Sequence, residues 1–199
     1  IWEYGNNYPN CGYGGRFAKW LDRQDKQAYN SFGNGSAMRV SAAGFAAKSL
    51  DKALELARRS AEVMHNHPEG INGAQATAAA IVLARHGNPK KEIRAHITAH
   101  FGYNLSFSIE QIRPHYRFDE TCQGSVPESI VAFLVSTDYR HALRLAISLG
   151  GDSETIACIA GGIAGAFYKN MPRDIELFVK ERLPEEFLAI IKTSDERFG

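Results

Sequence analysis

The pattern with the clearest chemistry is GGDSET at residues 150–155, in which Asp152, Glu154 and Thr155 carry oxygen donors at spacings i, i+2 and i+3. The glycine pair allows a sharp turn, and the first turn of a following helix has unpaired N–H groups. Oxygen ligands suit Mg²⁺ or Mn²⁺ rather than Zn²⁺, which prefers nitrogen and sulfur. The pattern predicts a site for a hard divalent cation. The alternative is an ordinary helix cap, because Asp and Ser are common N-cap residues.

A second candidate is the glycine-asparagine-glycine turn in GNGSAM at residues 33–38, with Ser36 near the start of a predicted helix. Such a turn presents backbone N–H groups at the positive end of a helix dipole, where they can hold phosphate without many basic side chains. The turn therefore predicts a phosphate-binding loop. The alternative is a plain loop before a capped helix.

A third candidate is the pair His65 and His67 in HNHPEG at residues 65–70. No partner cysteine or HExxH pattern accompanies them, which disfavours a transition-metal site. We predict hydrogen bonding or ring stacking against a ligand at the junction of two helices. The alternative is a turn whose polar groups are satisfied within the protein.

The elements that must position these residues are helical almost throughout from Ser36 onward, which predicts an all-α fold and a single domain spanning residues 1–199. Residues 1–35 are expected to be loop around one helix at 16–23, and the Ala-rich segment 68–86 is expected to be the buried centre. In the loop at 119–128, Pro127 and Glu128 fit an ordinary helix start. The predicted helices are 50–66, 68–86, 89–101, 124–136, 138–149, 152–168, and two amphipathic helices, 172–183 and 185–192, that should cover the core.

Composition excludes several function classes. A net charge of +1 with 44% hydrophobic and 23% charged residues is typical of a globular protein and gives no reason to expect nucleic acid or an anionic membrane as partner. No apolar run approaches the ~20 residues of a membrane span, and the start does not resemble a signal peptide, so we expect a cytoplasmic protein. The scattered Cys11, Cys122 and Cys158 predict no disulfide framework, and Cys158 is expected to be a buried small hydrophobe.

Four motifs, GNGSAMR, HNHPEG, CQGSVPE and GGDSETIACIAGGIAGAFY, occur in the order found in the ADP-ribosylglycohydrolase family, and nearly the whole chain resembles that family. The family includes the dinitrogenase reductase-activating glycohydrolase. The resemblance implies a compact multi-helix all-α fold and two Mg²⁺ or Mn²⁺ ions in the complete site. It also implies hydrolysis of the glycosidic bond between ADP-ribose and a modified protein side chain or small acceptor.

The resemblance implies roles for two groups of residues. It places Asp152, Glu154 and Thr155 in a metal-ligand motif. It assigns ADP-ribose binding to a loop and one neighbouring histidine: Gly33, Asn34, Gly35, Ser36, Met38 and His65. The partner it implies is an ADP-ribosylated protein or a small ADP-ribose conjugate.

Two departures from the family pattern define the alternatives. Glu154 stands where family members usually have Asp, and a Thr-Asp-Asp-Thr segment that supplies further metal ligands and a catalytic acid is not in the sequence. The chain therefore resembles the C-terminal larger part of the domain, with its catalytic residue and a partner segment expected upstream. One alternative is a non-catalytic ADP-ribose binder or a structural, crystallin-like relative. Another is a plain helical interaction domain, which makes the four motifs a coincidence.

Overall fold

The computed structural model describes residues 1–198 of the 199-residue chain. The structure is 64% helical, and the only strand-type pairing in the described part is one antiparallel bridge between Gly33 and Thr121. The prediction of an all-α fold is confirmed. None of the described helices combines the length and the apolar character that crossing a membrane requires.

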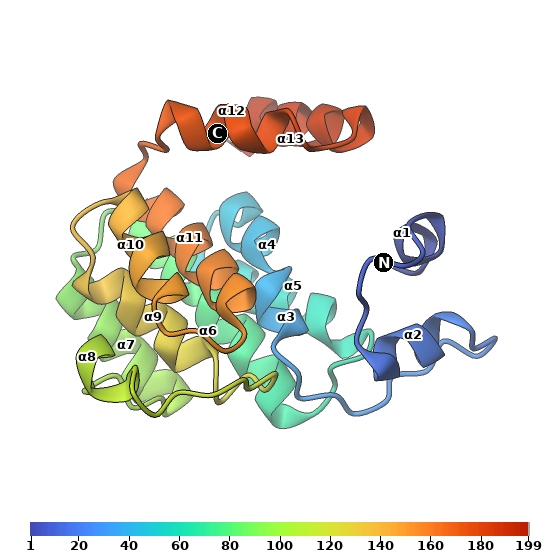
Figure 1. Cartoon of the computed structure of the whole chain (residues 1–199), viewed down its shortest axis with the longest axis horizontal. Helices are drawn as coiled ribbons and strands as arrows, with labels where there is room; N and C mark the ends of the chain where they lie inside the picture. Colours follow the sequence, from blue (N-terminus) through green and yellow to red (C-terminus); the bar gives the residue numbers. More distant parts are fainter. Residues whose placement is uncertain (199) are drawn as a thin grey trace.

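Helix α6 (Pro68–Arg85) is the buried centre, as its Ala-rich sequence predicted, and Figure 1 shows other helices packed around it. Small residues allow this close packing. A Cβ added to Gly44 of α4 would lie 2.7 Å from Ile81 Cγ2 and 3.2 Å from the Ala78 carbonyl oxygen. The helices that pack directly against α6 are α3 (Gly35–Met38), α4 (Ser41–Ala46), α5 (Leu50–Glu62), α7 (Lys90–Phe101), α9 (Val126–Val135) and α11 (Ser153–Tyr168). Helix α8 (Ile109–Ile112) packs mainly against α9, and α10 (Tyr139–Ile147) packs mainly against α9 and α11.

Local sequence signals explain where these helices begin and end. Ser49 caps α5 by accepting a hydrogen bond from the Lys52 N–H at 3.2 Å, and Asp138 caps α10 in the same way. Gly102, with φ of +72°, ends α7 in the left-handed conformation that glycine adopts without strain. Most predicted boundaries were therefore close, although α5 ends four residues earlier than predicted and the last helix, predicted to end at residue 192, continues to Phe198.

The N-terminal part differs from the prediction of a single helix at residues 16–23. The structure has two helices here, α1 (Trp2–Asn7) and α2 (Gly15–Leu21). The first was missed because six residues are too few to show a helical period.

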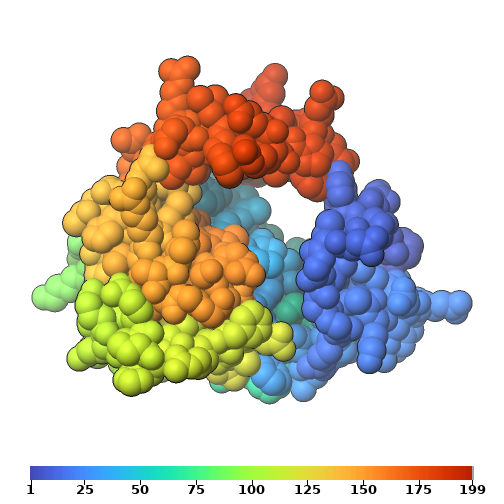
Figure 2. Space-filling view, viewed as in Figure 1, coloured from blue at the N-terminus to red at the C-terminus, as the bar shows by residue number. Residues whose placement is uncertain are grey.

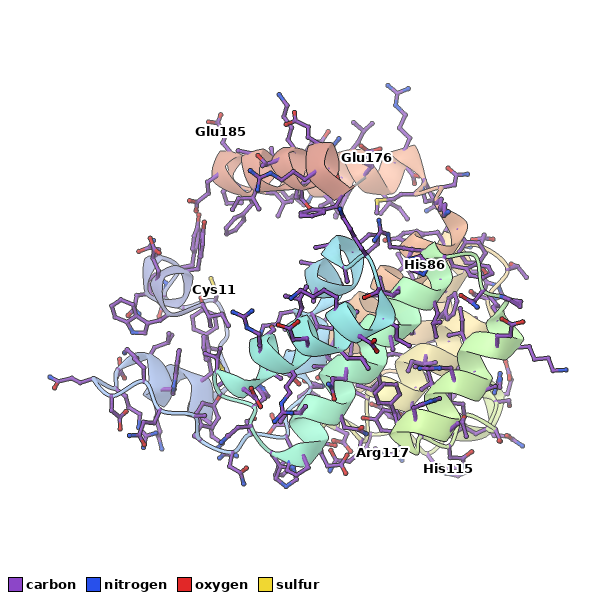
Figure 3. All side chains as sticks on the ribbon, turned by 180° about the vertical axis from the view of Figure 1, so that it is seen from behind. Cys11, His86, His115, Arg117, Glu176 and Glu185 are labelled. Atoms are coloured by element: carbon purple, nitrogen blue, oxygen red, sulfur yellow. The ribbon has the colours of Figure 1, made fainter. Side chains whose placement is uncertain are left out.

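The C-terminal part also differs from prediction. Helices α12 (Arg173–Lys180) and α13 (Glu185–Phe198) contain no buried residue, and of the two only α12 contributes a side chain, the partly buried Ile175, that packs against the core. Figure 2 shows an opening bounded by these two helices and the N-terminal part of the chain. From behind, Glu176 and Glu185 on these helices lie at the opposite side of the molecule from Arg117 (Figure 3). The spacing of apolar residues identifies which face of a helix is apolar, but it does not identify which surface, if any, covers that face.

Cys158 also differs from prediction. It was expected to be buried, but the structure places it in an exposed position on α11.

Candidate functional site

The predicted phosphate loop and the loop at residues 119–125 lie side by side. The N–H of Asn34 donates to the Glu120 carbonyl oxygen at 2.7 Å, and the N–H of Cys122 donates to the Phe32 carbonyl oxygen at 2.9 Å. These two hydrogen bonds form the antiparallel bridge between Gly33 and Thr121, which holds Asn34 against the second loop. Segments far apart in the sequence are thereby assembled into one site.

Asp152 occupies the N-cap position of α11, but its side chain makes no capping hydrogen bond. The residue is 6% exposed, and its Oδ2 accepts a hydrogen bond from Asn34 Nδ2 at 2.7 Å. The preceding Gly150 and Gly151 both have positive φ, which confirms the sharp glycine turn. The structure therefore does not use the Asp152 side chain as an ordinary cap, and instead holds this acid against the glycine loop.

Asn34 is itself fixed by further contacts. Its Nδ2 group also lies 2.9 Å from Ser125 Oγ and 3.4 Å from the Asp119 carbonyl oxygen. The single Ser125 hydroxyl proton lies within reach of two acceptors, the carbonyl oxygens of Asp119 at 2.9 Å and Thr121 at 2.8 Å. Sequence reasoning did not assign a site role to Ser125 or Asp119. Ser125 lies in the CQGSVPE motif, but from the sequence this segment was interpreted only as the start of a helix.

Thr155 lies one turn beyond Asp152, with its hydroxyl 3.6 Å from Met38 Sδ, whereas Glu154 is exposed. Positions i and i+3 of a helix share a face, so the Asp152 carboxylate and the Thr155 hydroxyl can serve one ligand. Both are oxygen donors of the kind that Mg²⁺ and Mn²⁺ prefer. Within residues 1–198, no group of three His, Cys, Asp or Glu side chains is arranged to hold a metal ion. Asp152 and Thr155 therefore present two oxygen donors, fewer than a complete divalent-cation site requires.

The predicted phosphate loop has fewer free donors than its sequence suggested. Gly33 N–H donates to Ser31 Oγ at 3.1 Å, and Asn34 N–H is used in the bridge to the second loop. The Ser36 hydroxyl is buried and donates to the Gly70 carbonyl oxygen at 2.7 Å. The donors that remain on this loop are backbone N–H groups in the first turn of α3, which have no acceptor within the helix.

The two histidines of the third motif have different environments. His65 is 6% exposed, and Cβ atoms added to Gly35 and Gly33 would lie 3.5 and 3.7 Å from its Nε2. His67 instead caps α6, because its Nδ1 accepts the Glu69 N–H at 3.1 Å. The structure therefore brings His65 to the glycine loop. His67 instead has its ring nitrogen satisfied within the turn, which was the alternative interpretation of this motif.

Glu128, in the first turn of α9, is an acid that sequence reasoning treated as ordinary. Its Oε2 is buried without a hydrogen-bond partner, and burial raises the pKa of Glu128 to about 7, with Asp119 contributing and its own backbone N–H opposing. A carboxyl pKa raised in the folded state means that the native protein binds the proton more tightly than the unfolded chain. The stabilisation is complete below about pH 4.5 and is lost as the pH rises towards 7.

We therefore expect Glu128→Gln to raise the free energy of unfolding at pH 8 by about 1–3 kcal/mol and by less at pH 5. Urea unfolding at the two pH values measures this. Glu110→Gln is the matched control, since Glu110 is exposed and hydrogen bonds to its own backbone N–H and to Ser108 lower its pKa. A Glu128→Gln variant that is less stable than the parent at pH 8 contradicts the prediction.

Comparison with known proteins gives consistent matches. The family model described as ADP-ribosylglycohydrolase matches residues 3–192. Mouse ADP-ribosylhydrolase ARH3 is 28% identical over 226 residues, with 80% of this chain and 59% of that protein covered. Bovine ADP-ribosylhydrolase ARH3 is 30% identical over 190 residues, with 69% of this chain and 50% of that protein covered. ADP-ribosylarginine hydrolase Tri1 of Pseudomonas putida (strain GB-1) is 28% identical over 142 residues, with 68% of this chain and 38% of that protein covered.

A solved structure titled "ADP-ribosylglycohydrolase-related protein complex" superposes with a TM-score of 0.67 at 22% identity, and covers 84% of this chain and 61% of that one. This likeness shows the fold. The chain spans 59% of the mouse relative and 50% of the bovine one.

Proposed function

Because the chain belongs to the ADP-ribosylglycohydrolase family, we propose that it contributes to hydrolysis of the glycosidic bond between ADP-ribose and a modified protein side chain or small acceptor. The observation that carries this proposal is the position of Asp152. A buried carboxylate that could have capped its own helix is instead bound to Asn34, 118 residues away, on the glycine loop. Holding an acid out of water without an ion-pair partner is costly, which favours a functional role over a purely structural one.

The proposed cofactor is Mg²⁺ or Mn²⁺, held by Asp152 and Thr155, with Glu154 as a third oxygen donor on a longer side chain. A bound divalent ion would orient the ribose hydroxyls and polarise the scissile centre. Because the described residues hold only part of a donor set, we propose that further ligands of a two-ion site and the catalytic acid come from a segment outside residues 1–198.

The proposed ADP-ribose site is the loop from Gly33 to Ser36 together with Met38 and His65. The N–H groups at the start of α3, which have no acceptor within that helix, would donate to the diphosphate. Met38, which is 40% exposed and touches Thr155, supplies an apolar wall between the loop and the proposed metal ligands. The Ser36 hydroxyl holds α6 in place rather than the ligand, because Gly70 already accepts its proton.

Calorimetric titration with ADP-ribose, with and without Mg²⁺, tests this proposal. We expect saturable binding that Mg²⁺ strengthens, and no comparable binding of adenosine, which lacks the diphosphate. Release of ADP-ribose from an ADP-ribosylated protein, measured in parallel, tests the hydrolase activity itself. Absence of any ADP-ribose binding contradicts the proposal.

A second candidate function is non-catalytic ADP-ribose binding, and two observations favour it for the chain by itself. Glu154 is exposed, and the described residues do not complete a metal-binding group. Binding of ADP-ribose that is indifferent to Mg²⁺, without release of product, supports this candidate over the hydrolase.

A further inference from the structure

Arg39 follows α3 and lies half-buried behind the glycine loop with only neutral partners. Nη1 donates to the Gly35 carbonyl oxygen at 3.0 Å, and Nη2 donates to the Ser60 carbonyl oxygen at 2.9 Å. Its Nε is buried without a partner. No salt bridge of Arg39 occurs in the described part of the chain. A partly buried cation without a counter-ion is costly, which points to a role beyond stability.

The same Nη2 group lies 3.3 Å from Nδ1 of His65. Arginine carries five N–H donors and no acceptor, so Nδ1 must accept this hydrogen bond with its lone pair. In neutral imidazole the proton is then on Nε2. The contact with Arg39 therefore selects one tautomer of His65.

The Nε2–H group selected in this way faces the glycine loop, as the 3.5 and 3.7 Å distances to the added Cβ atoms of Gly35 and Gly33 show. No acceptor for it is found among residues 1–198, although Nδ1 on the other side of the ring has one. A ligand lying on the loop is in position to supply the missing acceptor.

We propose that Arg39 is a positioning residue that fixes His65 as a permanent Nε2–H donor to an anionic oxygen of the ligand on the Gly33–Gly35 loop. This proposal rests on the proposed function for the identity of that ligand, the diphosphate of ADP-ribose. His65 then binds and orients the ligand and does not exchange protons with it.

The charged and titratable groups around His65 support an anionic acceptor. Arg39 approaches from α3, and Arg16 of α2 stacks on Tyr29, whose ring centroid lies 6.4 Å from that of His65. Burial, Arg39 and Arg16, in that order, lower the pKa of His65 to about 3, so the ring is neutral at physiological pH. Burial raises the pKa of Tyr29, which therefore stays neutral as well. Positive charge and an N–H donor together favour phosphate oxygen over a neutral carbonyl.

Nitrogen-15 NMR of the ligand-free chain tests the tautomer directly, with a His65→Gln variant assigning the signals. We expect an unprotonated Nδ1, a protonated Nε2 and no titration of His65 between pH 5 and 8. Arg39→Met should lower the share of the Nε2–H tautomer to that of unpartnered histidine, which favours Nε2–H only modestly, whereas Arg39→Lys should retain more of it. Arg16→Met is the matched control, because it removes a neighbouring positive charge but leaves the Nδ1 hydrogen bond, and its His65 tautomer should be unchanged.

Calorimetric titration of the same variants with ADP-ribose tests the consequence for binding. We expect Arg39→Met to weaken ADP-ribose binding about 10-fold or more, with circular dichroism confirming that the variant is folded. A protonated Nδ1 in the unsubstituted chain overturns the proposal, and this result needs no variant. Correct tautomer without any ADP-ribose binding contradicts the proposed function and the ligand assignment together, while ADP-ribose binding that Arg39→Met leaves intact contradicts the positioning role alone.

Discussion

Replacing Asp152 with Asn is expected to weaken Mg²⁺ or Mn²⁺ binding by about 100-fold and to remove the effect of the metal on ADP-ribose affinity. The variant removes the negative charge while keeping the shape and an oxygen that can still accept the Asn34 hydrogen bond. Its free energy of unfolding should therefore change by only about 1 kcal/mol. Titration with Mn²⁺ and urea unfolding measure the two effects separately.

The matched control for this substitution is Asp138→Asn. Asp138 is an exposed residue whose side chain does cap its helix, since it accepts the His141 N–H at 2.8 Å. Its replacement should leave metal binding unchanged. If Asp152→Asn binds the metal as the unsubstituted chain does, or unfolds, then Asp152 has a structural role and the proposed metal site is wrong.

Replacing Gly151 with Ala is expected to destabilise the protein by about 2–4 kcal/mol and to displace the turn that presents Asp152. Two costs add at this position. The φ of +59° is a conformation that costs an L-residue about 1–2 kcal/mol. A Cβ there would also lie 2.8 Å from the Tyr116 ring and 2.9 Å from the Arg117 carbonyl oxygen, where backbone cannot move aside cheaply.

Gly150 provides a matched comparison for the second cost. It has a φ of +73°, but an added Cβ meets no atom within 4 Å, so Gly150→Ala should lose only about 1 kcal/mol. Urea unfolding of the two variants separates the cost of the positive φ, which both share, from the cost of the steric contact, which only Gly151→Ala has. ADP-ribose titration of the same variants reports whether the turn is displaced. Equal destabilisation of the two variants would show that the contact with Arg117 does not matter.

The sequence alone determined most of the helices and the order of the motifs. Residues Ala53, Ala57 and Ala61 recur at helical period and are buried in α5, and the Ala-rich stretch of α6 forms the centre. The glycine turn before Asp152 was also predictable, because positive φ at adjacent positions is a local requirement that glycine meets. These features depend on neighbours within a few residues, and such neighbours can be read directly from the chain.

Tertiary structure alone decided which polar groups meet. The Asp152 side chain could have capped its own helix. It instead accepts a hydrogen bond from Asn34, 118 residues away in the sequence, because α11 packs against the loop that contains Asn34. The tautomer of His65 likewise depends on Arg39, which a motif identified but no spacing rule places beside the ring. For α12 and α13 the apolar period predicted burial, but the surface that covers a helix is supplied by the rest of the fold. Short-range backbone preferences fix the elements, whereas the partner of each buried polar group or apolar face is set by contacts between distant segments that leave no local pattern.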